Sequence, residues 1–227
     1  MQARMQRKLK AVLFDVDGTL VDSNDAHASA WVKAFTEHGV TVDAVSVRRS
    51  IGMGGDKLMP AVSGLEEDSA LGQKIAERRG EIFKEEFLPK LEAFRGARDL
   101  VDAIKQRGYT VVAASSAAKE ELVPLLKIAG ADALMDAKTS SGDADESKPA
   151  PDIVQAALQR AKAAPPEAVM IGDTPYDVAA ARSAGVRIIA FRSGGWLDPD
   201  LSGAIEIYDG AWDLLARFDR SLLSVAD

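Results

Sequence analysis

The sequence predicts an α/β protein: a doubly wound parallel sheet (a Rossmann-like core) with a small all-helical cap domain inserted after the first strand. Three observations support this fold class. Short continuous apolar runs recur along the chain, as expected of strands that helices cover on both faces. Amphipathic helical segments separate these runs, which is the rhythm of right-handed βαβ crossovers. Between residues 22 and 94 this rhythm stops and only helical patterns remain.

The predicted strands are four apolar runs, each followed by polar or glycine residues that end it. They are Ala11 to Phe14, Tyr109 to Ala114, Ala168 to Ile171, and Val186 to Phe191.

The predicted helices have apolar residues on one face, and glycine or proline near their ends. They are Asn24 to His38, Glu66 to Lys90, Gly96 to Arg107, Pro151 to Ala163, and Pro175 to Ala184. The segment Val45 to Ser50 is also expected to be helical. Together these patterns predict a catalytic core of residues 1–21 and 95–227 and a cap of residues 22–94.

Length and composition exclude several classes of protein. The chain has 227 residues, 47% of them hydrophobic and 28% charged, which is typical of one large globular domain or a core with a smaller module. The net charge of −7 argues against general nucleic-acid binding, which needs a basic face, but not against a small anionic substrate. The absence of cysteine excludes disulfides, thiolate zinc sites and cysteine nucleophiles.

The beginning of the chain predicts a cytoplasmic protein that does not enter a membrane. Residues 1–10 are basic, but the apolar run after them is only four residues long before Asp15 interrupts it. That is too short for the core of a signal peptide or for a membrane span.

Two acidic motifs follow two of the predicted strands. Asp15-Val16-Asp17-Gly18-Thr19 ends the first strand, and its two carboxylates, two residues apart, point to the same side. A calcium-binding EF-hand loop would need a glutamate at the twelfth position from Asp15, where Ala26 stands, so that interpretation is excluded.

The second motif, Gly172-Asp173-Thr174-Pro175-Tyr176-Asp177, ends another strand and begins a helix. Its acidic residues also suit simple helix capping. However, two strand ends that both offer carboxylates make a hard-oxygen site suited to Mg²⁺.

Hydroxyl and cationic groups complete the candidate site. Ser115 follows a predicted strand, where its hydroxyl suits binding of a phosphate oxygen, and Lys148 precedes a helix that starts with proline. Either residue alone would be interpreted as an ordinary strand end or a surface charge.

These four motifs, in this order, resemble the haloacid dehalogenase-like superfamily, and the helical insertion resembles the C1 cap of its phosphoglycolate phosphatase and β-phosphoglucomutase branch. The resemblance implies that Asp15 attacks phosphorus and that Asp17 acts as general acid and base. It implies that Mg²⁺ is held by the Asp15 carboxylate, the Asp17 backbone carbonyl and Asp173, and that Asp17 carries a proton in the first step, which crowding by carboxylates favours. The implied phosphate-binding residues are Ser115, Ser116 and Lys148, and the implied supporting residues are Asp177 and Thr19.

The implied function is a magnesium-dependent phosphatase for a small phosphorylated metabolite, acting as a monomer or weak homodimer. A β-phosphoglucomutase-like mutase is the alternative within enzymes, and a non-catalytic metabolite-binding or regulatory protein is the alternative from another class. The mutase is disfavoured because basic residues of the mutase cap loop are missing from Ile51 to Asp56, although Arg48, Arg49 and Lys57 lie nearby. Dehalogenation is disfavoured because those enzymes lack an equivalent of Asp17.

The cap supplies weaker candidates for substrate contact: His27, Arg49, Gly54 and Lys57. The glycines of residues 51–57 predict a flexible substrate-facing loop rather than a cofactor cradle, because no strand precedes them. Residues 192–196 are expected to form a surface loop, with the rim of the site as the alternative. Residues 143–146 are expected to form a solvated loop with one member able to orient Lys148.

Overall fold

The core is a sheet of six parallel strands, in the order β3-β2-β1-β4-β5-β6, in the computed structural model, which describes residues 8–224. The strands are β1 (Ala11–Phe14), β2 (Thr110–Ala114), β3 (Ala137–Thr139), β4 (Ala168–Gly172), β5 (Arg187–Phe191) and β6 (Glu206–Tyr208). This topology confirms the predicted fold class.

β1 is the central strand, which explains why it is fully apolar. All four of its residues are completely buried, and it pairs with β2 on one side and β4 on the other. Phe14, its last residue, lies opposite Ala113 and Ile171. The residues that follow β1 therefore emerge in the middle of the carboxyl edge of the sheet, where doubly wound folds bind their ligands.

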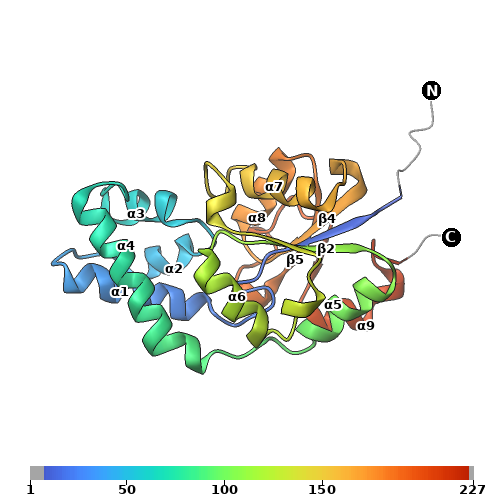
Figure 1. Cartoon of the computed structure of the whole chain (residues 1–227), viewed down its shortest axis with the longest axis horizontal. Helices are drawn as coiled ribbons and strands as arrows, with labels where there is room; N and C mark the ends of the chain where they lie inside the picture. The colour runs from blue at the N-terminus through green and yellow to red at the C-terminus, as the bar shows by residue number, and fades with distance from the viewer. Residues whose placement is uncertain (1–7, 225–227) are drawn as a thin grey trace.

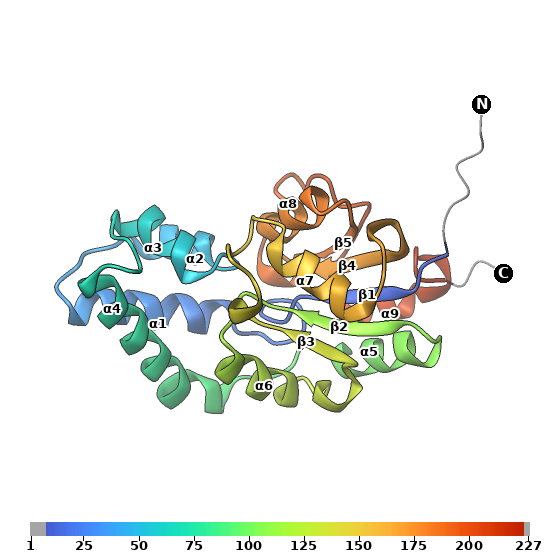
Figure 2. The same cartoon turned by 45° about the horizontal axis from the view of Figure 1, so that its top comes forward.

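Helices cover both faces of the sheet (Figures 1 and 2). They are α5 (Ala97–Gln106), α6 (Lys119–Ile128) and α9 (Ala211–Ala216) on one face, and α7 (Asp152–Ala161) and α8 (Pro175–Ser183) on the other. Alternate residues of β1 face opposite sides: Leu13 packs in the cluster that contains Ile153, and Phe14 packs in the cluster that contains Leu100. The core is thus a three-layer sandwich.

The segment between β1 and α5 is helical and lies beyond the carboxyl ends of the strands (Figure 1). It contains α1 (Asn24–Glu37), α2 (Ala44–Ser50), α3 (Gly55–Ser63) and α4 (Ala70–Ile82), followed by a π-helical turn (Phe83–Phe87) and a 3-10 turn (Leu88–Lys90). The chain enters and leaves this segment side by side, because the Asp22 amide donates to the Glu92 carbonyl and the Phe94 amide donates to the Leu20 carbonyl, both at 3.0 Å. The division into core and cap at residues 22 and 94 remains a prediction, and residues 1–7 and 225–227 of the predicted core lie outside the described part.

Five strands and α-helices of the described residues were not predicted from the sequence. They are the short edge strands β3 and β6 and the helices α3, α6 and α9. The two strands are three residues long and contain charged or half-exposed residues, so they lack the continuous apolar run that marks the inner strands. The expected flexible loop 51–57 is shorter than predicted, since α3 already begins at Gly55.

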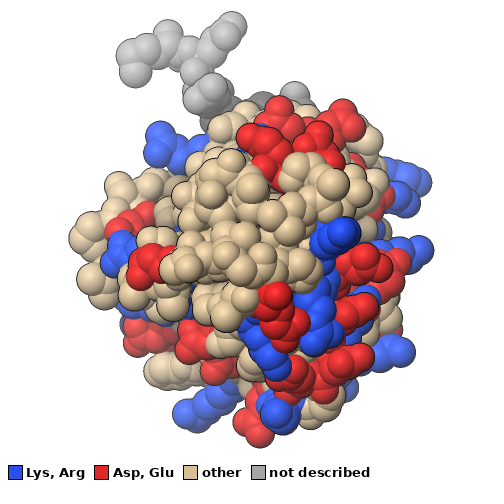
Figure 3. Space-filling model, turned by 90° about the vertical axis from the view of Figure 1, so that its left-hand side faces the viewer, with Lys and Arg blue, Asp and Glu red and all other residues tan. Residues whose placement is uncertain are grey.

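The surface of the cap end carries acidic and basic side chains side by side, next to a broad area without charges (Figure 3). Within residues 8–224, the helices are all too short or too polar to cross a membrane.

Candidate active site

Three strand ends bring the predicted motifs together. Asp15 follows β1, Ser115 follows β2 and Asp173 follows β4, and these three strands are neighbours. The Asp15 amide donates a 2.9 Å hydrogen bond to the Ile171 carbonyl, which fixes the first acidic motif against the strand that leads into the second acidic motif. Asp15 and Asp173 are buried, with 6% and 0% of their surface exposed.

Lys148 joins the acidic motifs through two buried ion pairs. Its ammonium lies 2.5 Å from Asp15 Oδ1 and 2.8 Å from Asp177 Oδ1, and Lys148 is almost completely buried. Burial by itself favours the neutral amine, but the charges of Asp15 and Asp177 outweigh it and raise the Lys148 pKa. Lys148 is therefore a fixed positive charge beside Asp15, in a position to contact a phosphoryl oxygen.

Asp173 is held by donors from the first motif and from the cap. Thr19 Oγ1 donates to its Oδ1 at 2.7 Å, and Asn24 Nδ2 donates to its Oδ2 at 3.0 Å. Thr19 Oγ1 also lies 3.3 Å from Asp15 Oδ2, so the predicted supporting residue connects both carboxylates. Asn24, at the first turn of α1, was not predicted from the sequence.

Asp177 supports the site from the first turn of α8. Its Oδ2 accepts hydrogen bonds from the Thr174 amide at 3.0 Å and the Thr174 hydroxyl at 2.7 Å, which caps the helix. Its Oδ1 pairs with Lys148. Because both oxygens already have partners, capping and lysine positioning are two functions of one side chain.

The carboxylates of Asp15, Asp173 and Asp177 fit a divalent cation. Each offers an oxygen, and the three oxygens lie within 4.8 Å of one another. Burial raises the pKa of Asp173 to about 7, and the charge of Asp177 adds to this effect; burial also raises the Asp15 pKa well above its usual range. Buried carboxylates that repel one another are stabilised by a hard cation such as Mg²⁺.

Two glycines leave space for the Asp173 carboxylate. Gly18 adopts φ +74°, and a Cβ there would lie 2.2 Å from Asp173 Oδ2; a Cβ on Gly194 would lie 1.9 Å from the same atom. Both glycines therefore border the candidate metal ligand.

A methyl group at Gly194 is therefore expected to impair activity. In Gly194→Ala, Asp173 must move, and since displacements of about 1 Å at catalytic groups reduce rates by about 100-fold, we expect a loss of this size in kcat and a raised Mg²⁺ requirement. The measurement is phosphate release against Mg²⁺ concentration. Gly142→Ala is the control, because a Cβ at Gly142 has no atom within 4 Å; equal activity of both variants would contradict the prediction.

Asp17 faces the cap rather than the carboxylate trio. Ser23 Oγ donates to its Oδ1, and His27 Nε2 lies 2.9 Å from the same oxygen, with the His27 ring stacked on Phe83. Burial raises the Asp17 pKa, but the charge and hydrogen bond of His27 and the bond from Ser23 outweigh it, and the pKa is lowered overall. Crowding by carboxylates was expected to keep Asp17 protonated. The groups nearest to this carboxylate are instead the hydrogen-bond donors His27 and Ser23, so this expectation was wrong.

Ser115 and Ser116 line a small inner cavity of about 60 Å³ together with Asp15, Asp17 and His27. Ser115 Oγ accepts a 3.0 Å hydrogen bond from the Ala117 amide. Ser116 Oγ is buried and has no hydrogen-bond partner among the described residues. It is thus free to bind a ligand oxygen.

The cap candidates have different positions. Gly54 lines the inner cavity, and its amide donates to Ser147 Oγ at 3.0 Å across the interface between cap and core. Lys57 pairs with Glu146 at 2.7 Å, and the Arg49 guanidinium lies over the Trp196 ring at 5.7 Å. Neither of these two cations lines the inner cavity, and their contact with the substrate stays a prediction.

The preferred surface position of residues 192–196 was wrong, whereas residues 143–146 are mostly exposed, as predicted. Residues 192–196 were expected at the surface, but Ser193 Oγ donates to the Gly18 carbonyl at 2.6 Å and Arg48 of α2 donates to the Gly194 carbonyl at 2.9 Å. The loop therefore forms one wall of the site. Residues 143–146 do not orient Lys148, whose ion-pair partners are Asp15 and Asp177.

Sequence and structure comparisons agree with this geometry. A family model described as haloacid dehalogenase-like hydrolase matches residues 9–185. The putative pyrophosphatase PpaX of Caldanaerobacter subterraneus subsp. tengcongensis is 30% identical over 187 residues, 82% of either chain. The chloroplastic protein SUPPRESSOR OF QUENCHING 1 of Arabidopsis thaliana is 36% identical over 190 residues, which are 82% of this chain but only 18% of that protein.

Among solved structures, a putative β-phosphoglucomutase from Bacteroides vulgatus superposes with a TM-score of 0.86 at 25% identity, covering 98% of this chain and 93% of that one. The family model covers well over half of the chain, and the predicted enzyme class, a hydrolase of this family, is confirmed. From its motifs, its fold and this match, the chain belongs to the haloacid dehalogenase-like hydrolase family.

Proposed function

We propose that this protein is a magnesium-dependent phosphatase that hydrolyses a small phosphorylated metabolite through an aspartyl-phosphate on Asp15. The observation that carries the proposal is the contact of Asp15 with Lys148 at the carboxyl end of β1, with Asp17 and Asp173 beside it. A nucleophile, a fixed cation, an acid–base group and a metal-binding carboxylate are the parts that phosphoryl transfer needs. The family membership and the relative named as a putative pyrophosphatase support it.

Asp15 attacks the phosphorus in the first step. Lys148 holds Asp15 Oδ1, which leaves the other carboxylate oxygen as the nucleophile. As the Asp15–phosphorus bond forms, the bond from phosphorus to the leaving oxygen breaks. Lys148 and the hydroxyls of Ser115 and Ser116 stabilise the charge on the phosphoryl oxygens.

Asp17 transfers the proton in both steps, and His27 positions the Asp17 carboxyl group. In the first step Asp17 protonates the leaving oxygen, and His27 Nε2, 2.9 Å from Asp17 Oδ1, orients this carboxyl group. In the second step Asp17 accepts a proton from the water that attacks phosphorus. The products are the free alcohol, inorganic phosphate and the restored Asp15 carboxylate.

Asp15 and Asp173 would hold Mg²⁺, with Asp177 positioned behind them. The ion supplies charge neutralisation of the phosphate and of the buried carboxylates. Among the residues of this chain, Thr19 and Asn24 keep Asp173 aimed at that position.

Phosphate release tests this function. With Mg²⁺, we expect inorganic phosphate from p-nitrophenyl phosphate and from at least one of a panel of phosphorylated metabolites, and loss of turnover when EDTA removes the metal. The mutase alternative predicts an isomerised sugar phosphate that depends on bisphosphate priming. No turnover of any phosphomonoester would favour the non-catalytic alternative.

A further inference from the structure

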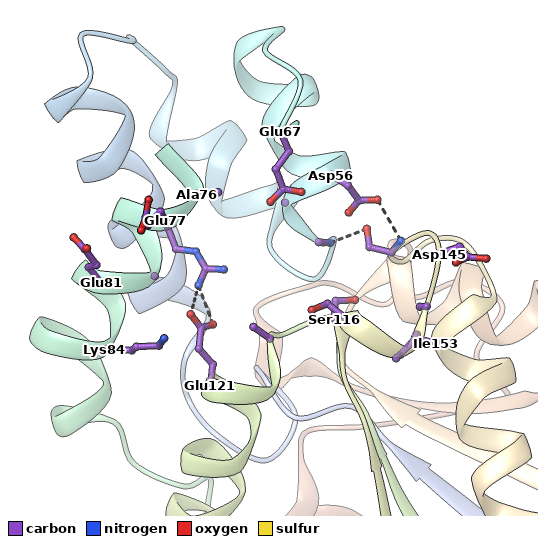
Figure 4. Close-up of a pocket in the computed structure, with 18 residues that line it drawn as sticks. Asp56, Glu67, Ala76, Glu77, Glu81, Lys84, Ser116, Glu121, Asp145 and Ile153 are labelled. Carbon is purple, nitrogen blue, oxygen red and sulfur yellow. Dashed lines mark hydrogen bonds and ion pairs between the residues drawn. The ribbon is translucent and has the colours of Figure 1, made fainter. Parts of the chain in front are cut away.

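A second, larger cavity adjoins the catalytic pocket. Its volume is about 620 Å³, and it lies between α3 and α4 of the cap and the loops at the edge of the core (Figure 4). The two cavities share five lining residues: Gly54, Gly55, Arg79, Ser116 and Glu121. The inner cavity of about 60 Å³ has room for little more than the phosphoryl group, so the remainder of a substrate bound at Asp15 must extend into the outer cavity.

The junction between the cavities is built from buried polar groups. Arg79 of α4 donates two 2.9 Å hydrogen bonds to Glu121 of α6, which is only 3% exposed, and the Arg79 guanidinium lies 5.1 Å from the centre of the Trp31 ring. Two junction atoms, Arg79 Nε and Ser116 Oγ, are buried and have no hydrogen-bond partner among the described residues. Both atoms can form a hydrogen bond with a polar ligand that extends from one cavity into the other.

The outer cavity is predominantly acidic. Six carboxylates line it, against two cations. The acidic residues are Asp56, Glu67, Glu77, Glu81, Glu121 and Asp145, and the cations are Arg79 and Lys84.

Three of these carboxylates have neither an ion-pair partner nor a hydrogen bond among the described residues. Glu121 is paired with Arg79, Glu81 is paired with Arg78, and Asp56 accepts a hydrogen bond from the Ser147 amide. The unpaired ones are therefore Glu67, Glu77 and Asp145.

Glu67 is the unpaired carboxylate best placed to meet a ligand. It projects from the cap side into the space above the Arg79–Glu121 pair (Figure 4). It is half-buried, and burial together with the charge of Asp56 raises its pKa, although the charge of Arg79 opposes them. A cation beside Glu67 would offset the cost of burying its charge and the repulsion from Asp56, whereas a second anion would add to the repulsion.

We propose that the part of the substrate that occupies the outer cavity carries an ammonium group, and that a second acidic group there is rejected. The proposal rests on the phosphatase function, because Asp15 and Lys148 fix the phosphoryl end in the inner cavity. It implies that phosphorylated amino alcohols or amino sugars are better substrates than pyrophosphate or esters whose alcohol carries a phosphate or carboxylate. The anionic phosphoryl group is attracted by Lys148 and the metal, and the rest of the molecule by the acidic wall.

A matched set of phosphomonoesters tests this charge preference. Glucosamine 6-phosphate and glucose 6-phosphate differ by one ammonium group, and 6-phosphogluconate adds a carboxylate. With Mg²⁺ at low ionic strength, we expect kcat/KM to fall in that order, by about fivefold or more per step. Equal values within twofold, or the reverse order, would overturn the proposal.

A conservative variant assigns the preference to the cavity wall. Glu67→Gln keeps the shape and removes the charge, so the ratio of kcat/KM for glucosamine 6-phosphate to that for glucose 6-phosphate should fall by at least half. Glu66→Gln is the matched control, since the neighbouring Glu66 is exposed and does not line either cavity; its ratio should equal that of the wild type. An unchanged ratio in Glu67→Gln would contradict the assignment.

The ionic strength gives a second readout that does not depend on any variant. The ratio measured on the wild-type protein should decrease as salt is added, because exposed charges are screened. Absence of any phosphate release, even from p-nitrophenyl phosphate, would overturn the phosphatase function and this proposal together. Release without an order by charge would overturn only the present one.

Discussion

Asp15→Asn is expected to abolish turnover, with kcat reduced by about 10⁴-fold or more, while the protein remains folded. The amide has the size of the carboxylate but is not a nucleophile, so an acyl-phosphate cannot form. The fold should survive because the charge of Asp15 is not a net source of stability: burial and the nearby Asp177, Asp173 and Asp17 raise its pKa well above the usual range, although Lys148 opposes them. Lys148 also keeps Asp177 as a partner.

The measurement is phosphate release by the variant, together with circular dichroism and thermal unfolding. Asp22→Asn is the matched control, since Asp22 is exposed and lies just beyond the first motif. We expect wild-type activity from this control. Activity of Asp15→Asn above one hundredth of the wild-type value, in a folded preparation, would contradict nucleophilic catalysis by Asp15.

The core of the site could be predicted from the sequence because the fold itself brings it together. Parallel strands end at one edge of the sheet, so polar residues after β1, β2 and β4 must be neighbours there. Asp15, Ser115 and Asp173 are marked by the apolar runs that precede them. Lys148 follows no such run; it was noted because it precedes a helix that starts with proline, and its phosphate-binding role came from the family resemblance.

The contacts between cap and core could not be predicted in this way. Asn24 binds Asp173, and Arg79 pairs with Glu121, across large separations in the sequence. Local periodicity shows which face of a helix is apolar, but not where the helix lies relative to the sheet. The apparent surface loop at Gly194 was missed for the same reason, because its partners Gly18 and Arg48 lie in other parts of the chain.

The edge strands illustrate a second limit. β3 and β6 have three residues each and lie at the two edges of the sheet, so each pairs with only one strand. They are less buried than β1, and fewer of their side chains need to be apolar. Their pairing with β2 and β5 is what makes them strands. A pattern search in the sequence has too little signal in three residues.

Asp173→Asn is expected to weaken metal binding and to reduce activity. The amide can still accept from Thr19 but is a weak ligand for Mg²⁺, so we expect the Mg²⁺ concentration for half-maximal activity to rise by about 100-fold and kcat to fall sharply. The measurement is a titration of activity with Mg²⁺. Asp68→Asn, an exposed substitution in the cap, is the control, and an unchanged titration in Asp173→Asn would refute the ligand assignment.

The same variant is expected to be more stable than the wild type when no metal is present. The pKa of Asp173 is about 7 in the folded protein, because of burial and the charge of Asp177, against an ordinary value of 3.8. The folded state therefore binds this proton more tightly than the unfolded state, and the associated stability is complete below pH 3.8 and is lost as the pH rises through 7. At pH 8 the free energy of unfolding is reduced by on the order of a few kcal/mol.

In EDTA, the thermal unfolding of the wild type should therefore shift to lower temperature between pH 5 and pH 8. Asp173→Asn, which has no charge to bury, should shift less, and added Mg²⁺ should restore the wild type but not the variant. Parallel pH profiles of the two proteins in EDTA would show that Asp173 carries no such strain, and that the three carboxylates do not need a cation to coexist.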